Sequence, residues 1–146
     1  MNNKQNQPCG EYLCMLNKED FSKKIQQKET QLFVLHNAKG MEVAVTNYGC
    51  AILAIMVPDR EGHMANVILG HDSIDHVVES PEPFLSTTIG RYGNRIANGC
   101  FTLEGQTYQL AINNGPNHLH GGPTGFHARV WDVVEQTADS VTFSYT

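Results

Sequence analysis

The stretch LFVLHNAKGMEVAVTN, residues 32 to 47, decides the fold class of this chain. Apolar residues fill its first part, and residues 37 to 40 (NAKG) are of the kinds that favour turns. Its second part alternates apolar with polar residues, at Met41, Val43 and Val45 against Glu42 and Thr46. A two-residue period is typical of a β-strand. The stretch therefore predicts two antiparallel strands joined by a tight turn.

The same signal continues on the C-terminal side. CAILAIMVPDREG, residues 50 to 62, is apolar on both faces and predicts a central buried strand closed by a Pro-Asp turn. ANVILG, residues 65 to 70, predicts another short strand, and ARVWDVV (128–134) and SVTFSYT (140–146) predict two more. FTLEGQTYQLAI, residues 101 to 112, predicts a hairpin turning at Glu104-Gly105. Its expected inward set is Phe101, Leu103, Tyr108 and Leu110.

Two stretches carry helix signals. In LNKEDFSKKI, residues 16 to 25, Asn17 can cap a short helix, with Leu16 and Phe21 placed as a hydrophobic staple around the cap. Phe21 and Ile25 would then share one face of that helix. SIDHVVES, residues 73 to 80, invites a second helical turn.

These patterns favour an all-β fold of one domain, an antiparallel sandwich or barrel. The chain has 146 residues, 40% hydrophobic and 17% charged, with a net charge of −5. No concentrated basic face is visible, which argues against nucleic-acid binding, and no apolar run is long enough to span a bilayer. We expect residues 1–15 to form a mobile leader and residues 16–146 to form the domain. We expect a cytoplasmic protein whose four cysteines, including Cys9 and Cys14, are free thiols.

Two polar, glycine-rich stretches could carry chemistry. IGRYGNRIANG, residues 89 to 99, offers the guanidinium groups of Arg91 and Arg95 and the amide of Asn94. GPNHLHGG, residues 115 to 122, places His118 and His120 one residue apart. Each residue alone is more often structural than functional, but two such stretches twenty residues apart suggest a site for a polar ligand.

The two histidines allow three interpretations. On a regular strand, His118 and His120 would face the same side and could bind a metal ion, with His127, Asp132 or Glu135 as a third ligand. They could also be plain turn residues. The third interpretation is an imidazole that hydrogen-bonds a polar ligand or moves a proton near neutral pH. We expect no metal, because these candidates form no recognised metal motif.

The order of these motifs resembles that of the aldose 1-epimerases, the galactose mutarotases. The resemblance rests on NAKGMEVAVTNYGCAI, VPDREG, ANVILG, TIGRYGNRIANGCFTLEGQTYQLAINNGPNHLHGG and GFHARVWDV, and it covers roughly residues 30 to 146. The pair GRYGNRIA and NHLHGG, with a hairpin between, is its most specific part.

The resemblance implies a large antiparallel β-sandwich of the galactose mutarotase type with a sugar site in a cleft, and no cofactor. Carried over to this chain, the sugar-binding residues are Asn94, Arg95 and His120, with His120 also an auxiliary catalytic group. A structural role is expected for His118, and Arg91 is expected to support its loop. The implied reaction interconverts the α and β anomers of a free hexose by acid–base opening and reclosure of the ring.

The chain departs from that family in length. Mutarotases are longer, and their principal histidine acid and glutamate base come from motifs that follow the part represented here. We therefore expect an incomplete sandwich, an incomplete catalytic site and self-association through an open sheet edge. The alternatives are a non-catalytic carbohydrate-binding β-domain, an epimerase of phosphorylated hexoses, and a metal-dependent β-barrel enzyme using His118 and His120.

Overall fold

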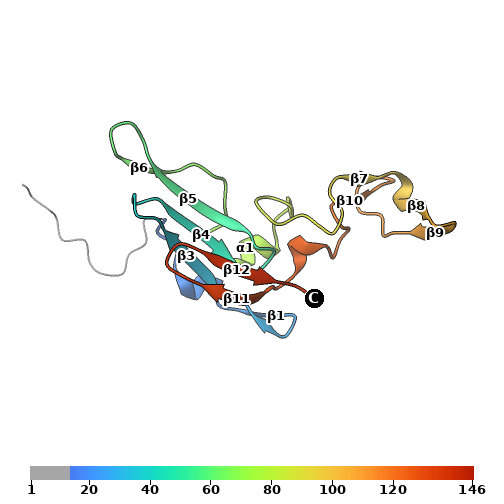
Figure 1. Cartoon of the computed structure of the whole chain (residues 1–146), viewed down its shortest axis with the longest axis horizontal. Coiled ribbons are helices and arrows are strands. Elements are labelled where there is room, and N and C mark those ends of the chain that lie inside the picture. The colour runs from blue at the N-terminus through green and yellow to red at the C-terminus, as the bar shows by residue number, and fades with distance from the viewer. Residues whose placement is uncertain (1–13) are drawn as a thin grey trace, which may run out of the picture.

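A computed structural model of the chain describes residues 14–146 (Figure 1). The expected leader falls almost wholly on residues 1–13, which lie outside the described part. Every pairing between the strands of the described part is antiparallel. This confirms the antiparallel β architecture predicted from the sequence.

The largest unit is a four-stranded sheet in the order β3-β4-β5-β6. Its strands are β3 (Leu32–His36), β4 (Glu42–Thr46), β5 (Ile52–Pro58) and β6 (Met64–Asn66). The predicted turn joins β3 to β4, where the side-chain oxygen of Asn37 accepts the amides of Lys39 and Met41. The strand predicted to be central, β5, lies between β4 and β6.

One face of this sheet carries the main hydrophobic core. Leu32, Ala44 and Ala54 are at most 6% exposed and belong to the same cluster as Phe21 and the helical residues Ile74 and Val77. The alternation along β4 proves misleading, because its polar residues Glu42 and Thr46 are the ones buried on this face, at 1% and 0% exposure. The Glu42 carboxylate is satisfied there by the backbone amide of Cys14, at 2.8 Å.

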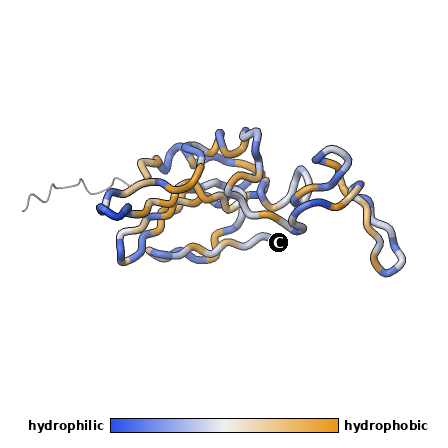
Figure 2. Tube along the Cα trace, turned by 90° about the horizontal axis from the view of Figure 1, so that it is seen from above, coloured by the Kyte–Doolittle hydropathy of each residue, from blue (hydrophilic) through white to orange (hydrophobic). Residues whose placement is uncertain are grey.

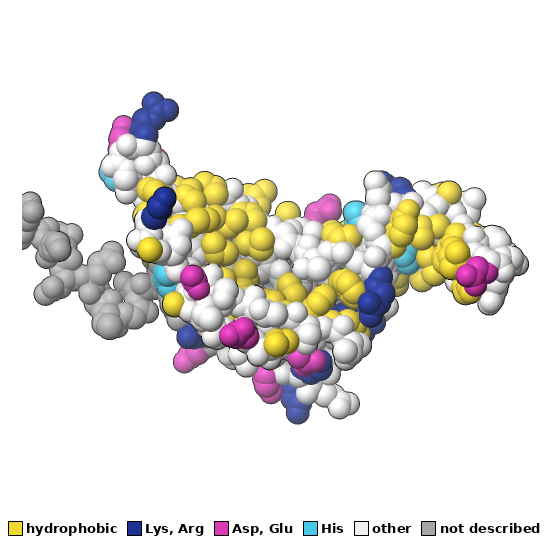
Figure 3. Space-filling view, in the orientation of Figure 1, with side chains coloured by type: hydrophobic (Ala, Val, Ile, Leu, Met, Phe, Trp, Pro, Cys, Tyr) yellow, Lys and Arg dark blue, Asp and Glu magenta, His cyan; other side chains and the backbone are white. Residues whose placement is uncertain are grey.

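The opposite face of the sheet is only partly covered. The hairpin of β11 (Asp132–Gln136) and β12 (Val141–Ser144) lies beside β3, where the Phe143 ring meets the Phe33 ring edge-on at 5.3 Å (Figure 1). The amide of His36 also donates to the carbonyl of Ala138 at the hairpin turn. Elsewhere hydrophobic side chains gather on the visible surface over the sheet (Figure 3).

The helices are shorter than the sequence suggested. Asn17 caps a 3-10 helix, η1 (Lys18–Phe21), by accepting the amide of Glu19. The predicted continuation to Ile25 is wrong, because the chain enters a two-stranded ribbon of β1 (Lys24–Ile25) and β2 (Lys28–Glu29). The predicted second helical turn is present as α1 (Ile74–Val78), capped by Ser73.

The remaining strands form an arm that projects from the sheet (Figures 1 and 2). It contains β7 (Arg95–Ile96) paired with β10 (His118–Leu119), and β8 (Cys100–Leu103) paired with β9 (Gln106–Gln109). One 3-10 turn, η2 (Ala97–Gly99), joins β7 to β8, and a second, η3 (Phe126–Ala128), follows β10.

Two sequence predictions fail at exposed segments. The hairpin turn at Glu104-Gly105 is confirmed, but the expected inward residues Phe101, Leu103 and Tyr108 are 37% to 57% exposed. The arm lies away from the sheet, so the Phe101 and Tyr108 rings stack on each other instead, at 5.1 Å. Residues 65 to 70 form a strand only as far as Asn66, and Leu69 is 77% exposed.

Candidate functional site

The two polar stretches meet where β7 pairs with β10. In this ladder Arg95 lies opposite Leu119, and Ile96 lies opposite His118. The side chains of Asn94, Arg95 and His120, which the sequence singled out, therefore emerge from neighbouring points at one end of this ladder. Asn94 and Arg95 are exposed and His120 is half-buried, so all three can meet a ligand.

Asn94 and His120 are joined by two hydrogen bonds. The amide of His120 donates to the carbonyl of Asn94 at 3.1 Å, and the amide of Asn94 donates to Nδ1 of His120 at 2.9 Å. Both residues have left-handed backbone conformations, with φ of 66° at Asn94 and 53° at His120. Asparagine and histidine are among the residues enriched in that region.

This contact fixes the proton arrangement of the His120 ring. A backbone N–H can only donate, so Nδ1 of His120 must be the acceptor and carries no proton. The proton of the neutral imidazole then lies on Nε2. His120 can thus present an N–H donor to an oxygen atom of a ligand.

Arg95 is oriented by two asparagines. Its Nε donates to the side-chain oxygen of Asn114 at 2.8 Å, and its Nη1 lies 3.4 Å from the side-chain oxygen of Asn94. The first bond fixes the plane of the guanidinium group, because Nε belongs to that plane. The other N–H donors stay available for a polar ligand.

A third asparagine holds the strand that leads to His120. Asn113 accepts the amide of Leu119 at 2.7 Å and donates to the carbonyl of the same residue at 3.0 Å. The turn between Asn113 and Leu119 is closed by two backbone hydrogen bonds between Asn114 and Asn117, one in each direction. The NNGPN segment therefore supports both Arg95 and His120.

Close packing of the two loops depends on glycine. A side chain at Gly121 would place its first carbon 1.9 Å from the carbonyl oxygen of Gly90, and Gly121 also has a φ of 87°. Both facts exclude other residues at this point without movement of the backbone. The loop after His120 can lie against the loop before Asn94 only because this position has no side chain.

His118 does not share the site. It is 6% exposed, and its Nδ1 is 2.8 Å from the carbonyl oxygen of Ala111. The strand alternation ends at Leu119, since His120 is left-handed. The expected structural role of His118 agrees with this geometry.

The metal interpretation gains no support from the described residues. His118 and His120 each use Nδ1 in a hydrogen bond, and neither belongs to a cluster of three potential ligands. Within residues 14–146 such a cluster consists of Asp59, Glu61 and His63, all exposed in the turn between β5 and β6. Two backbone amides of that turn bond to Asp59 Oδ1, so the cluster is explained by the turn itself.

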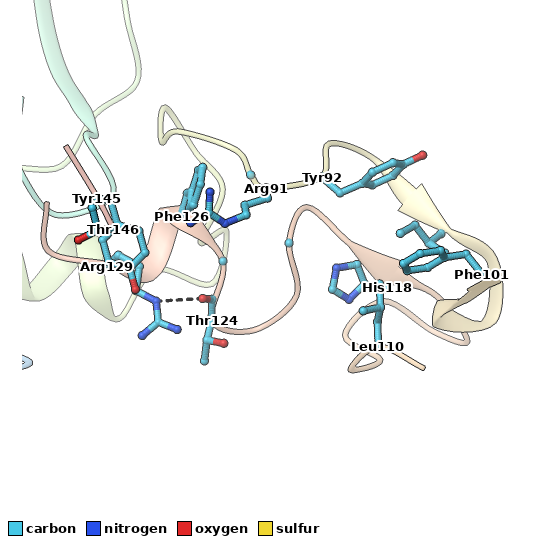
Figure 4. Close-up of a pocket in the computed structure, with 14 residues that line it drawn as sticks. Arg91, Tyr92, Phe101, Leu110, His118, Thr124, Phe126, Arg129, Tyr145 and Thr146 are labelled. Atoms are coloured by element: carbon cyan, nitrogen blue, oxygen red, sulfur yellow. Dashed lines mark hydrogen bonds between the residues drawn. The ribbon is translucent and has the colours of Figure 1, made fainter. Parts of the chain in front are cut away.

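A cavity of about 850 Å³ lies beside the site, between the arm and the sheet (Figure 4). Phe126, Arg129 and Tyr145 line it on the sheet side, and Phe101, Leu110 and His118 line it on the arm side. Arg91 reaches across, with its guanidinium carbon 5.1 Å from the centre of the Phe126 ring. None of Asn94, Arg95 and His120 lines this cavity. We place the site at these three residues because they come from the two polar loops and keep hydrogen-bonding groups that the protein does not use.

Sequence reasoning missed three contributors to this site. Asn113 and Asn114 resemble ordinary turn residues in sequence, although asparagines clustered in a turn do indicate side-chain bonds to the backbone. Phe84, which contacts the His120 ring at 4.9 Å, comes from a loop with no periodic pattern. No signal in the sequence places Phe84 there.

Comparison with known proteins identifies the family of this chain. The profile of a family described as aldose 1-epimerase matches residues 31–146. The galactose mutarotase of Bos taurus is 45% identical over 91 residues, and the aldose 1-epimerase of Escherichia coli is 38% identical over 114 residues. A solved structure of an aldose epimerase homologue from C. elegans superposes with a TM-score of 0.76 at 33% identity.

The chain spans about a quarter to a third of the length of these relatives. The matches cover 62% of this chain and 26% of the Bos taurus protein, and 78% of this chain and 33% of the Escherichia coli protein. The C. elegans structure is covered to 35%, and it covers 80% of this chain.

Proposed function

Since the chain belongs to the aldose 1-epimerase family, we propose that it contributes to the interconversion of the α and β anomers of a free hexose. The observation that carries this proposal is the convergence of Asn94, Arg95 and His120. Two loops separated by a hairpin bring them together, and each offers hydrogen-bonding groups that are not all used within the protein. A sugar is neutral and covered with hydroxyl groups, which can accept and donate hydrogen bonds to these three side chains.

In the proposed reaction a base removes the proton of the anomeric hydroxyl while an acid protonates the ring oxygen. The bond between C1 and the ring oxygen breaks, which gives the open-chain aldehyde. Rotation about the C1–C2 bond and the reverse proton transfers then close the other anomer. No bond to the protein is formed, and no atom is gained or lost.

Within this scheme the three residues position the sugar and stabilise charge. Nε2–H of His120 and the free N–H groups of Arg95 can donate to sugar oxygens, including a ring oxygen that is becoming negative. We assign the main proton transfers to an acid and a base other than these residues. The chain on its own is then expected to bind sugar but to accelerate mutarotation weakly.

Polarimetry of freshly dissolved α-D-galactose, with a chelator present, tests this function. Weak acceleration that disappears in His120→Asn would establish that this site acts in mutarotation, whereas strong acceleration would show that the segment needs no further acid or base. Saturable galactose binding without acceleration would support the positioning role. Absence of both binding and acceleration would contradict the proposed function of this chain. Glucose and glucose 6-phosphate in the same assays would show which hexoses the site accepts.

We also propose a cytoplasmic location and self-association. Cys14, Cys50 and Cys100 are free thiols, which suits a reducing compartment. In the part of the chain that the structure describes, no helix is long and apolar enough to cross a membrane. Among residues 14–146 the strand β12 pairs only with β11, so its outer edge can accept a strand from another copy.

A further inference from the structure

The Phe84 ring lies between two imidazole rings. Its centre is 4.9 Å from that of His120 and 4.5 Å from that of His127, and both contacts are edge-on, at 65° and 62°. Phe84 itself belongs to the turn formed by residues 82–87, where the amide of Leu85 bonds to the carbonyl of Glu82. Two segments far apart in the sequence, around residue 84 and residues 120–127, thus meet through a row of three rings.

The far end of this row is fixed to the sheet. His127 is 4% exposed, and its backbone carbonyl lies so close to Gly49 that a side chain there would fall 2.3 Å away. The next residues hold the same segment in place. The amide of Gly49 donates to the carbonyl of Arg129 at 2.8 Å, and Val130 forms a β-bridge with Tyr48. The position of His127 therefore follows that of the β4–β5 connection.

His127 behaves as an apolar partner of Phe84. Its Nδ1 is buried and has no hydrogen-bond partner among the described residues. Burial lowers the pKa of His127, and the positive charge of Arg129, and that of His120 whenever it is protonated, would act in the same direction, so the His127 ring is neutral at neutral pH. A neutral ring adds no repulsive charge near His120.

Besides the Phe84 contact, the His120 ring is held by one hydrogen bond to the Asn94 amide. The bond from the Asn94 amide holds one atom of the ring, Nδ1, and its strength depends on how the ring is turned about the Cβ–Cγ bond. An edge-on aromatic neighbour restricts that rotation, because such pairs have preferred geometries. We propose that Phe84, which packs against His127, is a positioning residue that fixes the His120 ring for sugar binding. This inference rests on the sugar site proposed above.

The test is nitrogen NMR of the histidine rings in the 146-residue chain, combined with titration by D-galactose. In the wild type we expect one set of His120 ring signals, with Nδ1 unprotonated and Nε2 protonated, and cross-relaxation between Phe84 and His120 ring protons. In Phe84→Leu we expect the His120 signals to shift toward a tautomer average and galactose affinity to fall roughly three- to tenfold. Phe84→Tyr should restore both. Phe101→Leu, at an exposed ring in the arm, should change neither.

The outcomes separate this proposal from the proposed function. If the wild type binds no galactose but Phe84→Leu alone disturbs the His120 tautomer, the sugar function fails and the positioning role stands. If Phe84→Leu folds and leaves both the tautomer and the affinity unchanged, the positioning role is overturned. Should Phe84→Leu not fold, the wild-type spectra decide, since absent Phe84–His120 cross-relaxation or several sets of His120 ring signals would also overturn it.

Discussion

Asn94 and His120 hold each other in place through a backbone bond in one direction and a backbone-to-ring bond in the other, at 3.1 and 2.9 Å. The two residues lie 26 positions apart and belong to different loops. The contact therefore couples the shape of the loops to the proton position on the ring. A change at either residue affects both the backbone and the donor that the ring presents.

Two substitutions of His120 separate its role as a hydrogen-bond donor to the ligand from its role in the loop backbone. His120→Asn and His120→Ala both remove the Nε2–H donor, so galactose affinity is expected to be lost in both. Asparagine tolerates the left-handed backbone better than alanine does, and His120→Ala is expected to lose about 1 kcal/mol more stability. NMR titration and urea denaturation measure the two quantities. Galactose binding by His120→Asn at wild-type affinity would remove His120 from the site.

The orientation of Arg95 depends on Asn114. Asn114→Ala removes the acceptor of the Nε bond, and we expect galactose affinity to fall roughly three- to tenfold, the size of about 1 kcal/mol of lost hydrogen-bond stabilisation. Asn114→Asp keeps an oxygen at the same place and should retain most of the affinity. Isothermal titration with galactose compares the two variants. Equal losses in both would show that Asn114 acts through its turn and not through Arg95.

Asn47 connects three parts of the fold and should matter for stability. Its side chain is buried and bonds to Gln31, Glu29 and Trp131. Asn47→Ala leaves these backbone groups unsatisfied, which is expected to cost about 2–4 kcal/mol in the free energy of unfolding. Asn66→Ala removes two bonds at exposed groups that water can replace, and its cost should stay within about 1 kcal/mol. Denaturant melts of both variants check the difference.

Cys50 should react slowly with alkylating reagents. Burial raises the pKa of its thiol from 9.0 to about 11, against a smaller lowering by the Thr88 hydroxyl. At pH 8 the thiolate fraction of such a thiol is on the order of 10⁻³, so iodoacetamide should label the exposed Cys100 before Cys50. Mass spectrometry of partly labelled protein gives the order. Labelling of Cys50 as fast as Cys100 in folded protein would contradict the burial.

The raised pKa of Cys50 also sets the direction of a pH effect. The folded state holds the thiol proton more tightly than the unfolded state does, so the contribution to stability is complete below pH 9. It is lost as the pH rises through the folded value of about 11. Cys50→Ala should therefore show a smaller fall in stability between pH 8.5 and pH 11 than the wild type does.

The open edge of β12 predicts association between copies. Thr142 is exposed on this strand, and Thr142→Lys would place a charge where a partner strand would pair. We expect light scattering to show concentration-dependent association in the wild type and a weaker tendency in this variant. Thr124→Lys, in an exposed loop, is the control. A wild type that stays monomeric at all concentrations would exclude the proposed pairing.

The sequence predicted the local structure well where turn chemistry decides it. The Asn37–Gly40 and Glu104–Gly105 turns form as predicted because asparagine bonds to the backbone and glycine accepts a positive φ. It failed on the burial of residues whose partners are distant. Glu42 is buried because the Cys14 amide reaches it from 28 residues away, and Phe101 is exposed because its hairpin leaves the sheet.

In the candidate site, too, local features could be predicted from the sequence and contacts with distant residues could not. The glycine-rich polar loops indicated where a site would lie, and the resemblance to the aldose 1-epimerases then singled out Asn94, Arg95 and His120 among their polar residues. Their supports could not be named, since the contact of Phe84 with His120 spans 36 positions and depends on how a loop without regular structure folds back. Only three-dimensional packing shows which apolar side chain stands beside the polar ones.

The projection of the β8–β9 hairpin suggests a practical use. Its two-residue turn at Glu104-Gly105 is exposed, has no neighbour within 4 Å of the position where a Gly105 side chain would begin, and lies at the end of the arm (Figure 1). Loop tips of this kind accept insertions with little cost to the rest of a fold. An epitope tag or a fluorescent label placed there would leave the bonds of Asn94, Arg95 and His120 intact. The hairpin is thus a suitable point of attachment for immobilising the protein with the proposed sugar site unobstructed.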